Sequence, residues 1–170
     1  IMQGFYEEWK FNHPYPEDIR AAFEKGTGKD LSWLFDDLLQ SSKKLDYKLS
    51  GYKDNSLVVK NCGMISGPVM INALNNDSVI YSEWIDGFTG KRTVQIPGDV
   101  NADRFYIDYD QNMLEINRHN NSIKTKGMFK KTEPLRIRFL GFVERPERSQ
   151  VNFVPVAGWN NYNKTMAGIM

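Results

Sequence analysis

The hydrophobic pattern changes its period within residues 30–61, which read DLSWLFDDLLQSSKKLDYKLSGYKDNSLVVKN. The first part carries an apolar stripe with the i, i+3, i+4, i+7, i+8 spacing of one buried helix face, made of Leu31, Leu34, Phe35, Leu38 and Leu39. Asp30 is placed to cap this helix. The polar run SSKK at residues 41–44 ends the pattern, and short runs rich in valine and tyrosine begin at Leu45. The sequence therefore predicts an α+β chain, with helices first and strands afterwards.

Residues 1–43 are predicted to be helical. A helix is expected from Pro16 to about Lys25, because proline suits the first helical position and the two carboxylates that follow it favour the positive end of a helix. Gly26-Thr27-Gly28 supplies a left-handed stop. Met2–Lys10 is expected to be the end of a longer helix that starts upstream. The stripe at 31–39 needs a helical partner larger than this chain provides.

Residues 44–125 are predicted to form an antiparallel β-sandwich of six or seven strands. Turn residues recur about every 8–14 positions with no helical period between them, which is typical of a sandwich. The turns are expected at Asp54-Asn55, Asn75-Asn76-Asp77, Asp86-Gly87 and Pro97-Gly98. The candidate strands are Asp46–Gly51, Ser56–Asn61, Pro68–Ala73, Ser78–Trp84, Arg92–Ile96, Arg104–Asp108 and Ser122–Lys124.

Residues 126–170 are predicted to be a β-rich tail. Leu135–Phe142 alternates apolar and polar residues, Glu144–Arg148 is a charged turn, and Val151–Val156 is a second extended piece. These two pieces are expected to form a two-stranded unit, and Gly158–Ile169 begins another strand. The tail is interpreted as the start of a further truncated region.

The composition excludes several classes of protein. The chain has 170 residues, 41% of them hydrophobic, which is enough for a core. With 22 Lys and Arg against 21 Asp and Glu the net charge is +1, so no global field attracts nucleic acid. The single cysteine, Cys62, excludes an internal disulfide and is expected to be a half-buried strand thiol. No signal peptide is visible in the given residues, which is interpreted as truncation, and no apolar run approaches the roughly 20 residues of a membrane-spanning helix.

No catalytic, cofactor-binding or metal-binding residue is predicted in this chain. A zinc peptidase site needs two histidines one helical turn apart, and His13 and His119 stand in unrelated contexts, as an ordered loop residue and an exposed turn residue. Cys62 lacks a sequence context that activates a thiol. Asp36 and Asp37 point about 100° apart on a helix and are interpreted as a solvated face, not as paired acids.

Four aromatic residues leave a binding module open as an alternative. Trp84, Phe88, Tyr106 and Tyr109 lie in or beside the predicted strands and could stack sugars or bases. Lysine and arginine are not interleaved with them on one strand face, so core packing and cross-strand pairing are favoured. The alternative function is a free-standing β-sandwich that binds or adheres to glycan or protein partners.

Several passages, taken in order, resemble aminopeptidase-N-like zinc metallopeptidases of the bacterial type. Residues 11–19, FNHPYPEDI, are similar to the family's "F-x-H-P-x-P-E-D-F", and residues 28–35, GKDLSWLF, to "G-x-D-L-S-W-F-F". Residues 59–69, VKNCGMISGPV, resemble "V-x-N-x-G-x-x-x-x-P-V", and residues 106–121 the ending "I-D-P-x-x-x-L-L-D-x-N-R-x-N-N", with Tyr109 where proline is usual. Weaker likeness is found at Trp84–Phe88, at Pro134–Phe139 and at Gly158–Tyr162, so the match spans roughly residues 5–165.

The resemblance implies a C-terminal fragment of such a peptidase. Residues 1–43 would then be the helical end of the catalytic domain, residues 44–125 an immunoglobulin-like sandwich, and residues 126–170 the β-rich tail. The parent would release N-terminal residues from peptides with a zinc ion held upstream of Ile1. The implied partner is the missing catalytic domain, the implied location is the periplasm or outer cell envelope, and an exposed helical face would allow an artefactual dimer.

Overall fold

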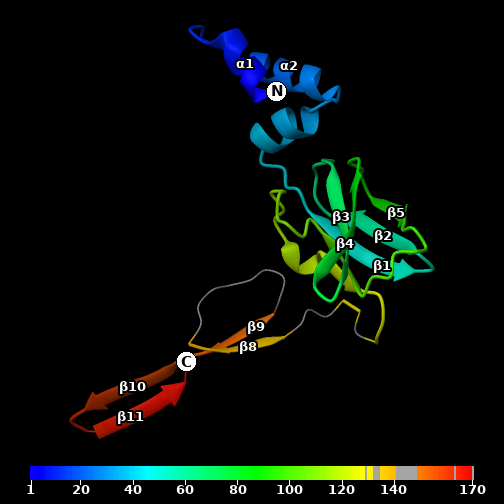
Figure 1. The fold of residues 1–170 in the computed structure, drawn as a ribbon. Coiled ribbons are helices and arrows are strands. Elements are labelled where there is room, and N and C mark those ends of the chain that lie inside the picture. The colour runs from blue at the N-terminus through cyan, green and yellow to red at the C-terminus, as the bar shows by residue number, and fades with distance from the viewer. Residues whose placement is uncertain (129, 132–134, 141–148, 163, 170) are drawn as a thin grey trace.

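The computed structural model describes residues 1–128, 130–131, 135–140, 149–162 and 164–169. The fold is α+β: helices occupy the first 40 residues and strands follow from Tyr47 onward. Figure 1 shows the helices at one end of the molecule, two sheets in the middle and a two-part β tail that extends away from them. None of the described helices combines the length and apolar character needed to cross a membrane.

The helical region contains α1 (Met2–Trp9), α2 (Pro16–Thr27) and a π-helix, η1 (Trp33–Leu39). The predicted helix at Pro16 is confirmed. Its first turn is fixed by Asp18 Oδ2, which accepts the Tyr15 N–H at 2.8 Å, and it ends at Gly28 with a left-handed φ of 66°.

The prediction of an α-helix with one buried stripe was wrong in two respects. The segment after Asp30 is a π-helix, whose i→i+5 bonds widen the turn and spread an α-helical stripe over a broader arc. Consequently Leu31 is buried and Leu38 packs against the core, whereas Leu39 is exposed.

The central strands form two antiparallel sheets. One sheet has the order β1-β2-β5, with β1 at Tyr47–Lys53, β2 at Ser56–Asn61 and β5 at Lys91–Gln95. The other has the order β4-β3-β6-β7, with β3 at Val69–Asn75, β4 at Ser78–Ile85, β6 at Arg104–Ile107 and β7 at Ser122–Lys124. All seven strands coincide with the predicted runs to within about two residues. These strands and the loops between them, residues 45–125, are called the two-sheet body below.

Two of the predicted turns are formed by left-handed pairs. Asp54 and Asn55 connect β1 to β2 with φ values of 49° and 57°, and Asn76 and Asp77 connect β3 to β4 with 51° and 60°. Asparagine and aspartate tolerate this region better than other residues with a side chain, and two consecutive positive φ angles match the twist of a tight hairpin. The turn residues therefore set the register of both hairpins.

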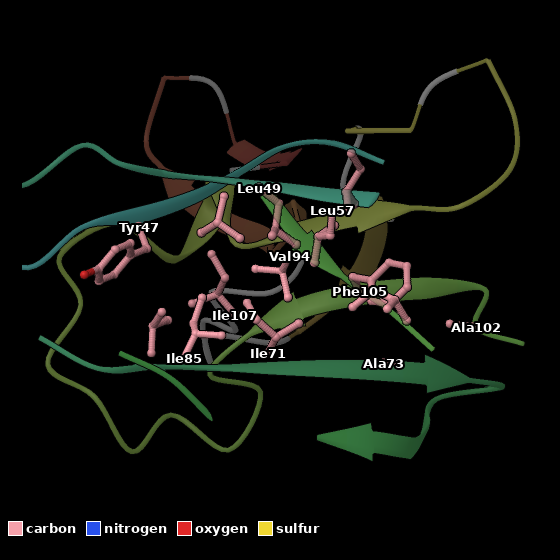
Figure 2. Packing of buried hydrophobic residues seen from close by; sticks show 14 of the residues in the cluster. Tyr47, Leu49, Leu57, Ile71, Ala73, Ile85, Val94, Ala102, Phe105 and Ile107 are labelled. Atoms are coloured by element: carbon pink, nitrogen blue, oxygen red, sulfur yellow. The ribbon is translucent and has the colours of Figure 1, made fainter. Parts of the chain in front are cut away.

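The hydrophobic core lies between the two sheets. Figure 2 shows Leu49, Leu57 and Val94 from one sheet pointing toward Ile71, Phe105 and other side chains of the second. The buried cluster consists of Leu45, Tyr47, Leu49, Leu57, Val59, Ile65, Val69, Ile71, Ala73, Ile85, Val94, Ile96, Ala102, Phe105, Ile107 and Ile123. Strand alternation supplies one inward side chain in every two, so both sheets contribute an apolar face.

The tail contains two separate strand pairs. β8 (Arg136–Phe139) runs parallel to β9 (Gln150–Phe153), and β10 (Pro155–Asn160) runs antiparallel to β11 (Lys164–Ile169). The two-stranded unit was predicted, but the single extended piece expected at 151–156 was wrong, because Val154 divides it between β9 and β10. The predicted charged turn at 144–148 and the end of the predicted strand at 141–142 lie outside the described residues.

We expect Phe105→Ala to lower the free energy of unfolding by about 3–5 kcal/mol, because Phe105 is 0% exposed and its ring lies 4.7 Å from that of Tyr52. Urea denaturation followed by far-UV circular dichroism measures the change. Phe139→Ala is the matched control: Phe139 is 71% exposed on β8, and its truncation should cost less than about 0.5 kcal/mol. Equal losses would contradict the location of the core.

Candidate functional site

The helical region is docked on the two-sheet body through Trp33. Trp33 of η1 is half-buried and packs against the core cluster, together with Leu38. Its ring covers Gly67, where an added Cβ would lie only 2.7 Å from Trp33 Cε3. Such an approach is closer than real Cβ contacts allow, so glycine is required for the indole to seat. Trp33 and Gly67 therefore form a specific junction between helices and sheets.

Polar contacts hold the helices to one another beside this junction. Arg20 of α2 donates to both carboxylate oxygens of Asp36 on η1, at 2.8 and 3.0 Å, and to Glu24 at 2.9 Å. The hydrogen bonds to Glu24 and Asp36 raise the pKa of Arg20, which keeps the guanidinium charged. Glu24 also accepts the Leu31 N–H at 3.2 Å. The region of η1 is thus tied to α2 by groups that lie 7 and 16 residues apart in sequence.

Six hydrophobic residues of the helical region are exposed to solvent. Leu31 is the one buried hydrophobic residue among residues 1–43. Phe11 is 98% exposed and adopts a positive φ of 71°, so a bulky side chain occupies an unfavourable backbone region without any packing in return. Further exposed hydrophobic residues in this region are Ile1, Met2, Tyr6, Tyr15 and Leu39. Together these residues are called the helical face below.

A buried polar network lies in the loop between β6 and β7. Asp108 is buried with a positive φ of 50°, and its carboxylate accepts the backbone N–H groups of Asn112 and Met113, each at 2.8 Å. It also accepts a hydrogen bond from Arg118 at 3.1 Å, and Arg118 donates to the Met113 carbonyl. A buried carboxylate with three donors around it is satisfied by the protein itself. Its role is to fold the loop.

Glu115 attaches this loop to the start of β1. One carboxylate oxygen accepts the Tyr47 N–H at 2.6 Å, and the other accepts a hydrogen bond from the Asn121 side chain. Burial raises the pKa of Glu115 to about 7, and this outweighs the hydrogen bonds from Tyr47 and Asn121 and the nearby charge of Arg118, which lower it. Both oxygens are occupied by structural donors. Glu115 is therefore a loop anchor whose charge depends on pH near neutrality.

The residues considered from sequence for metal binding or catalysis lie apart. His13 is exposed in the loop before α2, and His119 is exposed within the short 3₁₀ helix η2 (Arg118–Asn120). Among the described residues, no three His, Cys, Asp or Glu side chains gather into a group able to hold a metal ion.

Two further expectations about single residues can be compared with the structure. Asp36 and Asp37 form ion pairs with Arg20 and Lys43. The expectation of a half-buried strand thiol was wrong, because β2 ends at Asn61 and Cys62 is exposed just beyond it.

The four aromatic residues do not form one platform. The Phe88 ring packs 5.3 Å from that of Tyr47, and the Tyr106 ring, which is buried, lies 5.3 Å from that of Tyr109. These contacts agree with the packing role favoured by the sequence. Trp84 differs, because it is 54% exposed on the edge strand β4, which also exposes Val79 and Ile80 nearer its start.

The network residues were not identified from sequence. Asp108, Glu115 and Arg118 lie in the passage 106–121 that resembles the peptidase family, but spacing alone did not assign them a role. An aspartate at the end of the predicted strand Arg104–Asp108 was the available signal, since a carboxylate that is buried there needs several donors.

Comparisons with known proteins leave the relationship open. No protein-family model matches the chain, and no curated protein or solved structure is significantly similar to it.

We expect Trp33→Ala to loosen the junction. Trypsin cleavage after Lys43 and Lys44, in the segment between η1 and β1, should accelerate at least roughly tenfold, because proteolysis follows the population of the opened form. Mass spectrometry of the released two-sheet body measures this rate. Leu39→Ala is the control, since Leu39 lies on the same helix but is exposed. Unchanged cleavage of the Trp33 variant would show that the indole does not hold the junction.

We expect Glu115→Gln to stabilise the protein above neutral pH. The pKa of Glu115 is raised in the fold, from an ordinary 4.5 to about 7, so its contribution to stability is complete below pH 4.5 and is lost as the pH rises through 7. A glutamine cannot ionise, so the variant should be more stable than the wild type at pH 8 by at most about 3 kcal/mol. Denaturant titrations at pH 5 and pH 8 measure the difference. The exposed Glu17→Gln should follow the wild-type profile, whereas parallel profiles for Glu115→Gln would refute the raised pKa.

Proposed function

We propose that this chain is a non-catalytic part of a zinc aminopeptidase-like protein. In this proposal an immunoglobulin-like sandwich, the two-sheet body, braces the helical end of a catalytic domain. The observation that carries the proposal is the contrast between the helical face, which is open and apolar, and the junction at Trp33, which is closed and specific. In the proposal the helical segment contacts the two-sheet body through Trp33 and contacts a second neighbour through the helical face.

The helical face supports a missing helical neighbour. Exposure of Phe11 costs apolar burial, and its left-handed backbone adds a strain that an asparagine or glycine would avoid. Single exposed hydrophobic residues are ordinary, but this short region exposes six of them, on α1, on η1 and in the segments next to the helices. The neighbour that would cover them in the proposal is the rest of the catalytic domain.

The strand order supports the immunoglobulin-like part of the proposal. The sheet orders β1-β2-β5 and β3-β6-β7 correspond to the A-B-E and C-F-G strands of an immunoglobulin-like fold, and β4 pairs with β3 instead of completing the first sheet. Related sandwiches share the architecture without keeping every strand in the same sheet. A closed core of this kind makes a rigid support.

The chemistry of the parent is assigned to residues outside this chain. In the proposal the zinc ion and its general base lie in the catalytic domain, the substrate is a peptide, and the product is its N-terminal residue. This chain contributes a scaffold and no catalytic group. The periplasm or outer cell envelope is the proposed location, supported by the likeness of the tail to envelope-associated relatives. The exposed hydrophobic residues of the tail, including Phe139, Trp159 and Ile169, are consistent with further β structure beside them.

Reading the coding sequence upstream of the Ile1 codon tests the proposal directly. The expected result is a His-Glu-x-x-His helix followed by a second glutamate, which is the ligand set of a zinc peptidase. Enzymology complements this reading: the purified chain should leave aminoacyl-arylamides uncleaved, and the longer protein should cleave them in a chelator-sensitive manner. Without these motifs upstream, the peptidase part of the proposal is refuted.

We expect the isolated chain to self-associate through the helical face. Phe11→Asn should weaken the dimer about tenfold or more, because asparagine is polar and tolerates the positive φ at this position. Sedimentation equilibrium over a range of concentrations measures the constant. Phe139→Asn, which removes an exposed phenylalanine from the tail, is the matched control. An effect of the tail variant alone would place the contact on the tail.

A binding module remains the second candidate function, and the exposed Trp84 favours it. Trp84 lies on β4, whose outer edge has no partner strand among the described residues. Under this alternative, a polysaccharide panel should yield a ligand that quenches tryptophan fluorescence, and Trp84→Ala should abolish that quenching. If no polysaccharide in the panel binds, the glycan-binding alternative is refuted.

A further inference from the structure

A hollow of about 380 Å³ opens at one end of the β4-β3-β6-β7 sheet. It lies where β3 ends, where β6 begins and where β7 ends. The side chains of Asn75, Asn101, Arg104, Lys124, Thr125 and Lys126 line it. The hollow is large enough for a small organic ligand, and most of the residues that line it carry polar side chains.

Positive charge dominates this hollow. Arg104, Lys124 and Lys126 contribute three cationic groups, against the single carboxylate of Asp103. Within the described part of the chain, no carboxylate lies within 4.0 Å of any of the three cations. The Asp103 carboxylate is itself engaged, because it accepts the Asn76 N–H at 3.1 Å. The site therefore holds an excess of uncompensated positive charge.

The sheet register places two of the cations opposite each other. Arg104 of β6 pairs directly with Lys124 of β7 in the antiparallel ladder. Like charges at directly opposed positions destabilise a sheet, whereas an opposite charge or a neutral residue would not. An anion bound between the two side chains would remove the repulsion.

The walls of the hollow are fixed by hydrogen bonds. The Asn75 side chain donates to the Asn101 carbonyl at 2.7 Å, and the Thr125 hydroxyl donates to the Ala102 carbonyl at 2.9 Å. The Thr125 N–H donates to the Asp103 carbonyl at 3.0 Å. Arg104 is held by the Tyr106 hydroxyl, to which it donates at 2.9 Å, and its guanidinium lies 5.8 Å from the centre of the Tyr106 ring. The backbone of the walls and the Arg104 guanidinium are thus held in place before a ligand binds.

We propose that this hollow is a binding site for a phosphate group carried by a small ligand. A guanidinium fork and two ammonium groups match the charge and the several acceptor oxygens of a phosphate monoester. The amide groups of Asn75 and Asn101 border the space that remains for the rest of the ligand. The same chemistry occurs in a free phosphate ester and in the headgroup of a phosphatidic acid, and binding experiments separate these two sources.

The first experiment measures binding by the full chain with isothermal titration calorimetry at constant ionic strength. The probes are inorganic phosphate, glycerol 3-phosphate and vesicles of neutral lipid with and without phosphatidic acid. We expect saturable binding that Lys124→Ala and Lys126→Ala each weaken about tenfold, as expected for loss of one charge-assisted contact. Lys91→Ala, an exposed lysine on β5 of the other sheet, is the control and should bind as the wild type does.

The outcomes of this experiment are distinct. Binding of glycerol 3-phosphate supports the site with a soluble ligand, and binding confined to phosphatidic acid vesicles supports it with a lipid headgroup. Binding that responds equally to Lys91→Ala and Lys124→Ala, or no binding of any probe, overturns the proposal. None of these results depends on a catalytic domain. The proposed scaffold function can therefore be refuted while the phosphate site is supported, and the phosphate site can be refuted while the scaffold function is supported.

A second variant separates ligand binding from a merely structural role. Lys124→Glu places a carboxylate opposite Arg104, so the melting temperature without phosphate should rise above that of the wild type. Phosphate should raise the melting temperature of the wild type and leave that of the variant unchanged. A variant that melts lower and is still stabilised by phosphate would overturn the assignment, because Lys124 would then serve the fold and not the anion.

Discussion

The burial of β3 on both of its faces is the constraint on which the rest of the structure depends. β3 is paired on one side with β4 and on the other with β6, and its inward residues Ile71 and Ala73 are fully buried. Its outward residue Asn72 is buried as well, so the NH₂ and the C=O of its side-chain amide both need hydrogen-bond partners. The Asn72 side chain donates to the Ser82 hydroxyl at 2.9 Å and accepts the Tyr109 N–H at 3.1 Å. One polar residue thereby fixes the neighbouring strand and the start of the long loop.

This loop also forms a contact with the other sheet, across the end of the core. From Tyr109 the chain turns through the Asp108 network and returns at Glu115, which binds the first residue of β1. The polar groups are inside because the loop crosses the end of the core, where backbone donors cannot reach water. A neutral or charged Glu115 can hold the Tyr47 N–H, but burial favours the neutral form. The connection between the sheets is thus sensitive to pH in a way that the apolar core is not.

The two ends of the two-sheet body are held by different kinds of interaction. At one end Gly67 admits the Trp33 indole, so the helices are seated by shape and by apolar contact. At the other, Arg104 and Lys124 are brought together by strand register in spite of their repulsion. The first arrangement supports the proposed scaffold and the second supports a phosphate site. The close-packed core between the two ends is rigid. The Trp33 junction and the Arg104–Lys124 pair share no residue.

The sequence by itself determined the elements whose cause is local. Alternation predicted all seven strands of the body, asparagine and aspartate pairs predicted both tight hairpins, and proline with following carboxylates predicted the start of α2. Only the tertiary structure decided the π-helical turn at Trp33–Leu39, the parallel pairing of β8 with β9, the exposure of Cys62 and the position of Glu115, which acts on a residue 68 positions away. These features, and the approach of Arg104 to Lys124, depend on which distant groups share a buried or crowded space. Periodicity reports which face of an element is apolar, but it carries no information about the partner that the face or the charge will meet.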